Sequence, residues 1–266
     1  LLFTISTDIA QCEGSSTTSF REIPTNSHNS STSQISRTWQ KLYSAIYDAN
    51  DFIETVSGRM DNWGSSDREL ATIYLGEARA LRALFYFELV RWYGNVVLMT
   101  STADSRRKDE TFEQTAAKDV YAYIEEDLKY AAEVLPWAVD DTRRTTNAYR
   151  FSKGAALGLL AKVYCTWAGY PVRDESKWAE AEKAARRVVE SGKHRLISDY
   201  ETVWKNTCNG IWDAGESLIE VSFYSPTGLD SDNTAGRIGK WNGVSATTVE
   251  GERGRNAANW KVTYNF

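Results

Sequence analysis

Apolar residues recur at intervals of three and four positions from Trp39 to Val188, and this pattern constrains the fold more than any other feature. The first stripe runs from Trp39 to Val56 and ends before Gly58. The second begins near Asp67 and ends at Gly94; its members are Leu70, Tyr74, Ala78, Leu81, Phe85, Leu89 and Trp92. Each stripe predicts a helix that packs one apolar side against its neighbours.

The same spacing predicts three further helices. The third runs over about residues 115–135 and stops before Pro136. The fourth follows Ser152 as its N-cap and is apolar nearly all round, which predicts burial between neighbours. The fifth begins after Ser176 as its cap and closes with Gly192 in a left-handed conformation. The fourth and fifth helices form a pair of about tetratricopeptide length, so the sequence predicts a mainly α fold, a tetratricopeptide-like helical-repeat scaffold.

Long loops are predicted outside these helices. Residues 1–38 form a loop region rich in Ser and Thr, residues 39–200 the helical repeat core, and residues 201–266 a loop-rich region. Alternation of Ile219, Val221 and Phe223 with polar residues predicts a short strand, and thus a small β element near residues 216–224. We expect residues 1–266 to form one domain that is incomplete at both ends.

Composition and charge exclude several classes of protein. The net charge of −5 and the lack of a long basic run disfavour a nucleic-acid partner. No apolar stretch is long enough to span a bilayer. Three widely spaced cysteines without a CxxC pair argue against a disulfide framework and a zinc site. Only two histidines, His28 and His194, are available as a base that could activate a nucleophile, so this kind of catalytic site is disfavoured. We therefore expect no metal, no cofactor and no catalytic residues.

Paired carboxylates raise the possibility of a glycoside hydrolase, which needs two acids across the bond that it cleaves. The candidates are residues 125–127 and the pair Glu77 and Glu88. A solvated helix surface explains the first cluster better, and an ion pair explains Glu77, which lies near Arg82. Spacing alone does not establish a catalytic pair.

Aromatic residues are abundant, with ten Trp and fourteen Tyr, and most belong to the helical stripes. The exceptions lie between helices or in predicted loops beside amides and carboxylates: Trp63, Trp212, Tyr224, Trp241 and Trp260. Such rings suit a sugar, whose CH face stacks on the ring while its hydroxyls take hydrogen bonds. Alternatively, these rings fasten the loops to the helical body.

The second helix resembles that of the SusD-like (RagB/SusD) family of outer-membrane nutrient-binding lipoproteins. The matching positions are Glu77, Ala78, Arg79, Leu81, Arg82, Ala83, Tyr86, Phe87, Leu89, Val90, Tyr93, Gly94, Val96 and Leu98. Val97 stands where the family has proline. The other helices agree in order, so that the resemblance covers roughly residues 39–223.

The resemblance implies a helical scaffold that captures oligosaccharides or other nutrients at the outer cell surface and is not an enzyme. It also implies a partner, a SusC-like TonB-dependent outer-membrane transporter on which such a protein sits as a lid. The implied location is the cell outer membrane, as a surface-exposed lipoprotein held by a lipid anchor outside this chain. Cys12 does not match the family's lipidation site.

The predicted glycan site combines this resemblance with the aromatic residues. Ser6, Thr7 and Asp8 resemble the start of a loop that helps to form the family's glycan site. We predict that this loop and the polar segment after it face aromatic residues near the other end of the chain. The members are Asp8, Phe20, Arg21, Asn26, Asn29, Trp212, Tyr224 and Trp241.

Two other functions stay open at this stage. A helical-repeat module that binds a peptide or protein would keep its aromatic and polar residues on a helix face. An all-helical glycoside hydrolase would need two convergent carboxylates.

Overall fold

The computed structural model describes residues 10–12, 22–105, 112–141, 149–221 and 260–262. Chain contacts divide it into two compact units, residues 1–40 with 222–266, and residues 41–221. The single domain expected over residues 1–266 stays a prediction, and each unit is described by itself.

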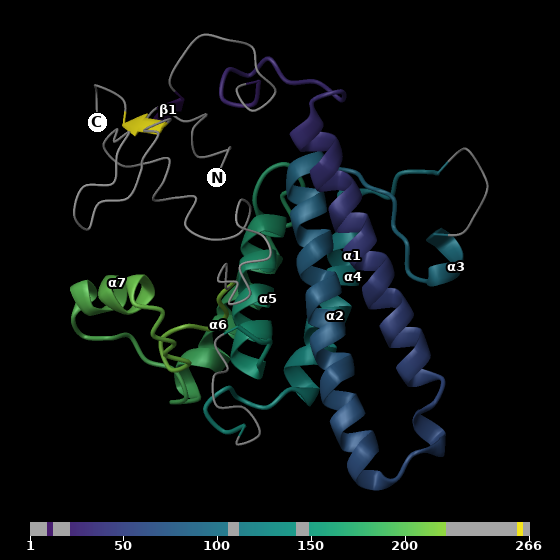
Figure 1. The fold of residues 1–266 in the computed structure, drawn as a ribbon, viewed down its shortest axis with the longest axis vertical. Helices are drawn as coiled ribbons and strands as arrows, with labels where there is room; N and C mark the ends of the chain where they lie inside the picture. The colour runs from purple at the N-terminus through teal and green to yellow at the C-terminus, as the bar shows by residue number, and fades with distance from the viewer. Residues whose placement is uncertain (1–9, 13–21, 106–111, 142–148, 222–259, 263–266) are drawn as a thin grey trace, which may run out of the picture. The chain divides into compact units, whose positions relative to one another are not determined.

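Helices dominate the described residues (Figure 1). They are α1 (Ser33–Ser57), α2 (Ser65–Tyr93), α3 (Thr102–Ser105), α4 (Ala117–Val134), α5 (Lys153–Ala168), α6 (Lys177–Glu190) and α7 (Tyr200–Cys208), with a 3-10 helix η2 (Met60–Asn62) between α1 and α2. The mainly α prediction is confirmed. None of these helices combines the length and apolar character that a membrane span requires.

Consecutive packing builds the core of residues 41–221. Helix α2 packs against α4, α4 against α5, and α5 against α6. Small residues permit the close approach of α2 and α4, because a β-carbon at Gly76 would lie 2.6 Å from Cγ2 of Val134. The side chains of Tyr86, Phe87 and Leu128 are fully buried in this core. Helices that each bury a face against the next one form the repeat that the spacing predicted.

The helix boundaries follow most of the predicted signals. Ser152 caps α5, since its hydroxyl accepts a hydrogen bond from the N–H of Ala155 at 3.2 Å. Gly192 has φ +64°, in the left-handed region expected after α6. Ser176 precedes α6 as predicted but does not cap it with its side chain, because its hydroxyl bonds to the carboxylate of Asp174.

Three local features differ from the sequence-based predictions. Helix α1 begins at Ser33, so the predicted loop region over residues 1–38 extends too far. Helix α7 lies largely inside the region predicted to be loop-rich, and it buries none of its residues. No strand forms over residues 216–221, while residues 222–224 lie outside the described part of the chain.

A short antiparallel sheet belongs to the other unit. Strand β1 (Ala10–Cys12) pairs with β2 (Trp260–Val262), with Ala10 opposite Val262 and Cys12 opposite Trp260. The sequence did not predict this pairing, because its two strands lie near opposite ends of the chain and each alternates over only three residues.

Two charged groups lie elsewhere than predicted. Asp127, expected with Glu125 on a solvated helix surface, is buried next to Arg82. Glu77 forms the expected ion pair, but its partner is Arg150 and not Arg82. Asp127 therefore joins α4 to α2, and Glu77 joins α2 to the segment before α5.

The predicted packing stripe of α2 is wrong in part. Leu70, Tyr74, Leu81 and Trp92 are all more than a third exposed. A second apolar set faces the core instead: Ala71, Ile73, Leu75, Ala80, Ala83, Tyr86, Phe87 and Val90. Helix α2 is therefore apolar on more than one side.

Candidate functional site

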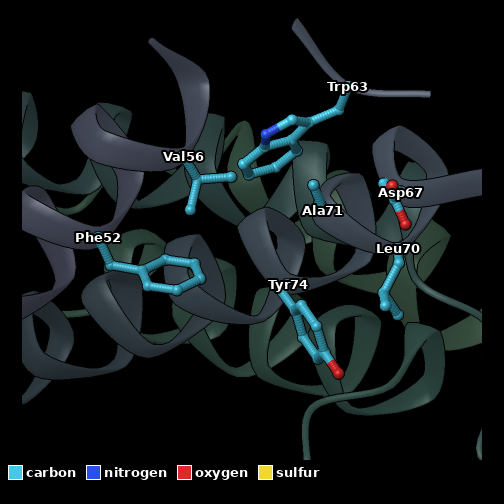
Figure 2. Close-up of a pocket in the computed structure, with 7 residues that line it drawn as sticks. All are labelled: Phe52, Val56, Trp63, Asp67, Leu70, Ala71 and Tyr74. Carbon is cyan, nitrogen blue, oxygen red and sulfur yellow. The ribbon is translucent and has the colours of Figure 1, made fainter. Parts of the chain in front are cut away.

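Two adjoining cavities lie between α1 and α2. The first has a volume of about 350 Å³ and is lined by Phe52, Val56, Trp63, Asp67, Leu70, Ala71 and Tyr74. Figure 2 shows the ring of Phe52 directed toward Tyr74, and the indole of Trp63 between Val56 and Ala71. The apolar lining comes from residues that recur every three or four positions on each helix, so helix geometry places them together.

The second cavity shares Phe52 and Tyr74 with the first and has a volume of about 560 Å³. Its other lining residues are Ala45, Asp48, Ala49, Glu77, Ala78, Leu81, Phe85 and Arg150. Because the two cavities share residues, they form one continuous surface, called here the α1–α2 groove. Its volume would accommodate a small ligand or several large side chains.

Charge at the groove is concentrated in one ion pair and two carboxylates. Arg150 donates a hydrogen bond from Nε to Glu77 at 3.3 Å, and its guanidinium lies 5.7 Å from the centre of the Tyr74 ring. The hydrogen bonds to Glu77 raise the pKa of Arg150 above its ordinary value. Asp48 and Asp67 line one cavity each, and neither forms an ion pair within the described residues.

The predicted site residue Trp212 has a structural partner. Its ring meets that of Tyr149 edge-on, with centroids 5.6 Å apart and an interplanar angle of 74°. Trp212 is partly buried, whereas Tyr149 is 47% exposed. Tyr149 immediately precedes Arg150, so this aromatic pair lies next in sequence to a residue of the groove.

The predicted site residues Asn26 and Asn29 belong to the other unit and form turns there. Asn26 has φ +54°, and its N–H donates to the carbonyl of Ile23 at 3.1 Å. The side-chain oxygen of Asn29 accepts from the N–H of Ser31 at 2.8 Å. Both asparagines are exposed, but the oxygen of Asn29 already serves its own turn.

The remaining predicted site residues lie outside the described part of the chain: Asp8, Phe20, Arg21, Tyr224 and Trp241. The predicted assembly of all eight residues around one groove therefore stays a prediction. Within the described ranges, no three His, Cys, Asp or Glu side chains gather closely enough to hold a metal ion.

Sequence reasoning missed the α1–α2 groove. It assigned Leu70, Tyr74 and Leu81 to the packed face of α2, while the structure leaves them at the surface. The available signal was the second apolar face of the same helix, because a helix that is apolar on two sides needs two partners.

Comparisons with known proteins identify similar chains. Residues 3–165 match the SusD-like family model described as "Starch-binding associating with outer membrane". A SusD-like protein of Bacteroides ovatus is 30% identical over 193 residues, which are 71% of this chain and 33% of the relative. The chain therefore spans about a third of the length of this curated relative.

Solved structures are similar over a larger share of the chain. The crystal structure of a SusD homologue from Bacteroides thetaiotaomicron has 59% sequence identity and a TM-score of 0.89, covering 98% of this chain and 49% of that chain. A laminarin-binding SusD-like protein has 25% identity and a TM-score of 0.65, covering 83% of this chain and 45% of that one. The predicted helical-repeat fold is confirmed, and the chain spans about half the length of these structures.

Proposed function

Since the chain belongs to the SusD-like family, we propose that it takes part in capturing oligosaccharides or related nutrients at the outer cell surface. The family consists of carbohydrate-binding proteins without catalytic activity. The observation that carries the proposal is the 59% identity to a solved SusD homologue over 98% of this chain. That identity and the TM-score of 0.89 support a shared scaffold.

The transporter partner and the location are part of this proposal. The captured nutrient passes to a SusC-like TonB-dependent transporter, and the protein is a surface-exposed lipoprotein of the outer membrane. The family description supports the location, because it names association with the outer membrane. The transporter partner rests on the resemblance to SusD-like proteins alone.

We propose Trp212 as one sugar-stacking residue. Its edge-on contact with Tyr149 fixes the ring orientation, and a fixed ring loses little entropy when it stacks on a pyranose. The α1–α2 groove suits a sugar poorly, because its lining is mostly aliphatic and aromatic and its Arg150 is already paired with Glu77. Asp8, Phe20, Arg21, Asn26, Asn29, Tyr224 and Trp241 remain in the proposed site on the sequence argument alone.

Titration calorimetry against laminarin, starch and xyloglucan oligosaccharides tests the carbohydrate function. Binding of one of them is expected, and turnover of none. Failure of every glycan in a broad panel, or release of reducing ends, would contradict the proposal.

Alanine variants test the site separately from the function. Trp212→Ala and Trp241→Ala should each weaken binding about tenfold, because a lost stacking contact of about 1.4 kcal/mol equals a factor of ten. Trp178→Ala is the matched control, since Trp178 is a half-exposed tryptophan on α6 outside the proposed site. Unchanged affinity in both site variants would remove these two residues from the site while leaving the glycan function intact.

A further inference from the structure

The α1–α2 groove is long enough to accommodate a third helix. Along α1 it is lined at positions 45, 48, 49, 52 and 56, and along α2 from Asp67 to Phe85. At 1.5 Å per residue, the stretch of α2 is about 27 Å long, the length of a helix of about five turns. Two helices that flank an open apolar channel provide the usual receptor for an amphipathic helix.

The groove exposes large apolar side chains along its whole length. Phe52 and Leu81 are each 41% exposed, and Leu70 and Tyr74 are only slightly less so. These residues line a single connected surface rather than being scattered, and connected apolar surface of this kind marks an interaction site. The energy available from covering it is hydrophobic, so the occupant presents an apolar face.

The charged residues of the groove indicate which charged residues its occupant should carry. Asp48 lies in one cavity and Asp67 in the other, and neither has an ion-pair partner in the described part of the chain. Four charged residues line the two cavities, and three of them are acidic: Asp48, Asp67 and Glu77, with Arg150 as the basic one. An occupant with Lys or Arg beside its apolar face would complement Asp48 and Asp67, which are called here the acidic rim of the groove.

We propose that the α1–α2 groove binds an amphipathic helix of a partner protein, about five turns long, with an apolar face flanked by Lys or Arg. This proposal does not depend on the proposed glycan function. The apolar anchors supply affinity, and the rim carboxylates select the charge of the partner.

A designed peptide provides the probe. It has 18 residues, Leu at positions spaced by three and four, and Lys on both flanks of the Leu face; one analogue carries Glu in place of Lys, and another has a central Pro. Fluorescence anisotropy of the labelled peptides with the 266-residue chain should show the Lys peptide binding at least tenfold more tightly than either analogue. A tenfold preference over the Pro analogue would show that the bound peptide is helical. The same preference over the Glu analogue would show that the acidic rim contributes to binding.

Variants locate the binding in the groove. Leu81→Lys should weaken the Lys peptide at least tenfold, whereas Val189→Lys should leave it unchanged, because Val189 is an exposed apolar residue on α6 outside the groove. Asp48→Asn should weaken the Lys peptide severalfold and reduce the salt dependence of its affinity. Circular dichroism of each variant establishes that it is folded.

Four results would overturn the proposal. Equal affinity for the Pro analogue would show that no helix is recognised, and equal affinity of Leu81→Lys would place binding elsewhere. Self-association that Leu81→Lys abolishes, without peptide binding, would make a second copy the occupant. Absence of peptide binding, with groove amides protected from hydrogen exchange in the full-length protein, would show that the same polypeptide fills the groove.

Discussion

Arg82 on α2 and Asp127 on α4 form a buried ion pair with two parallel hydrogen bonds. Nε of Arg82 lies 2.8 Å from Oδ2 of Asp127, and Nη2 lies 2.9 Å from Oδ1. The side chains are 5% and 1% exposed, and Nη1 of Arg82 also donates to Asn50 of α1 at 2.7 Å. Burial lowers the pKa of the Arg82 guanidinium, but the hydrogen bonds and negative charge of Asp127 raise this pKa above its ordinary value. The pair therefore joins three helices through one charged centre.

Asp127→Ala should lower the free energy of unfolding by about 3 to 5 kcal/mol, because it leaves the buried Arg82 charge without its carboxylate. Urea unfolding at pH 7 measures this loss. Glu182→Ala is the control: it removes an exposed partner of Arg186 and should barely move the unfolding midpoint. Equal effects of the two variants would contradict the account.

Replacing both partners distinguishes a buried charge from lost packing. A chain with both Arg82→Leu and Asp127→Leu should be more stable than Asp127→Ala, since neither charge remains buried alone. A double variant less stable than Asp127→Ala would show that the hydrogen bond to Asn50 dominates instead.

Glu125 should make stability depend on pH. It accepts hydrogen bonds from Lys129 at 2.5 Å, Tyr164 at 2.8 Å and Lys177 at 3.0 Å. Burial raises the pKa of Glu125, but these hydrogen bonds outweigh it and lower the pKa below its ordinary value. A lowered folded pKa stabilises the protein above the unfolded pKa of about 4.3, and this contribution is lost as the pH falls through the folded pKa.

Glu125→Gln should therefore cost about 1.5 to 3 kcal/mol at pH 7 and progressively less below about pH 4. Urea unfolding of wild type and variant between pH 3 and pH 7 measures the gap. A gap that stays constant over this range would show that Glu125 acts through packing and not through its charge.

Gly76→Ala should be neutral or destabilise the protein by up to about 2 kcal/mol. Alanine favours the helix by about 1 kcal/mol, but its methyl group would overlap Cγ2 of Val134, and overpacking costs about 1 to 3 kcal/mol. Adding Val134→Ala should make the Gly76→Ala change more favourable, as a thermal-unfolding double-mutant cycle would measure. A Gly76→Ala effect that is the same in both backgrounds would place the strain elsewhere.

Local signals predicted most of the helices correctly. The ends of α5 and α6 follow from Ser152 and Gly192, because caps and left-handed glycines act within a few residues of the chain. Helix α7 was missed, since it buries no side chain and so has no strong apolar stripe. The pairing of Ala10 with Val262 could not be predicted from local pattern.

The candidate sites depended more strongly on tertiary structure. Trp212 was recognised as an aromatic residue outside the helical stripes, but its contact with Tyr149 joins residues far apart in sequence. The partner of Glu77 likewise proved to be Arg150 rather than its near neighbour Arg82. Long-range pairs of this kind have no signature in a single sequence.

The sequence by itself determined that this chain is a set of helices with apolar faces and the SusD-like pattern, because apolar spacing and capping are local properties. Only the tertiary structure decided which face of α2 is buried and which face lines the α1–α2 groove. Periodicity shows that a helix has apolar faces, whereas burial depends on the neighbours that each face meets.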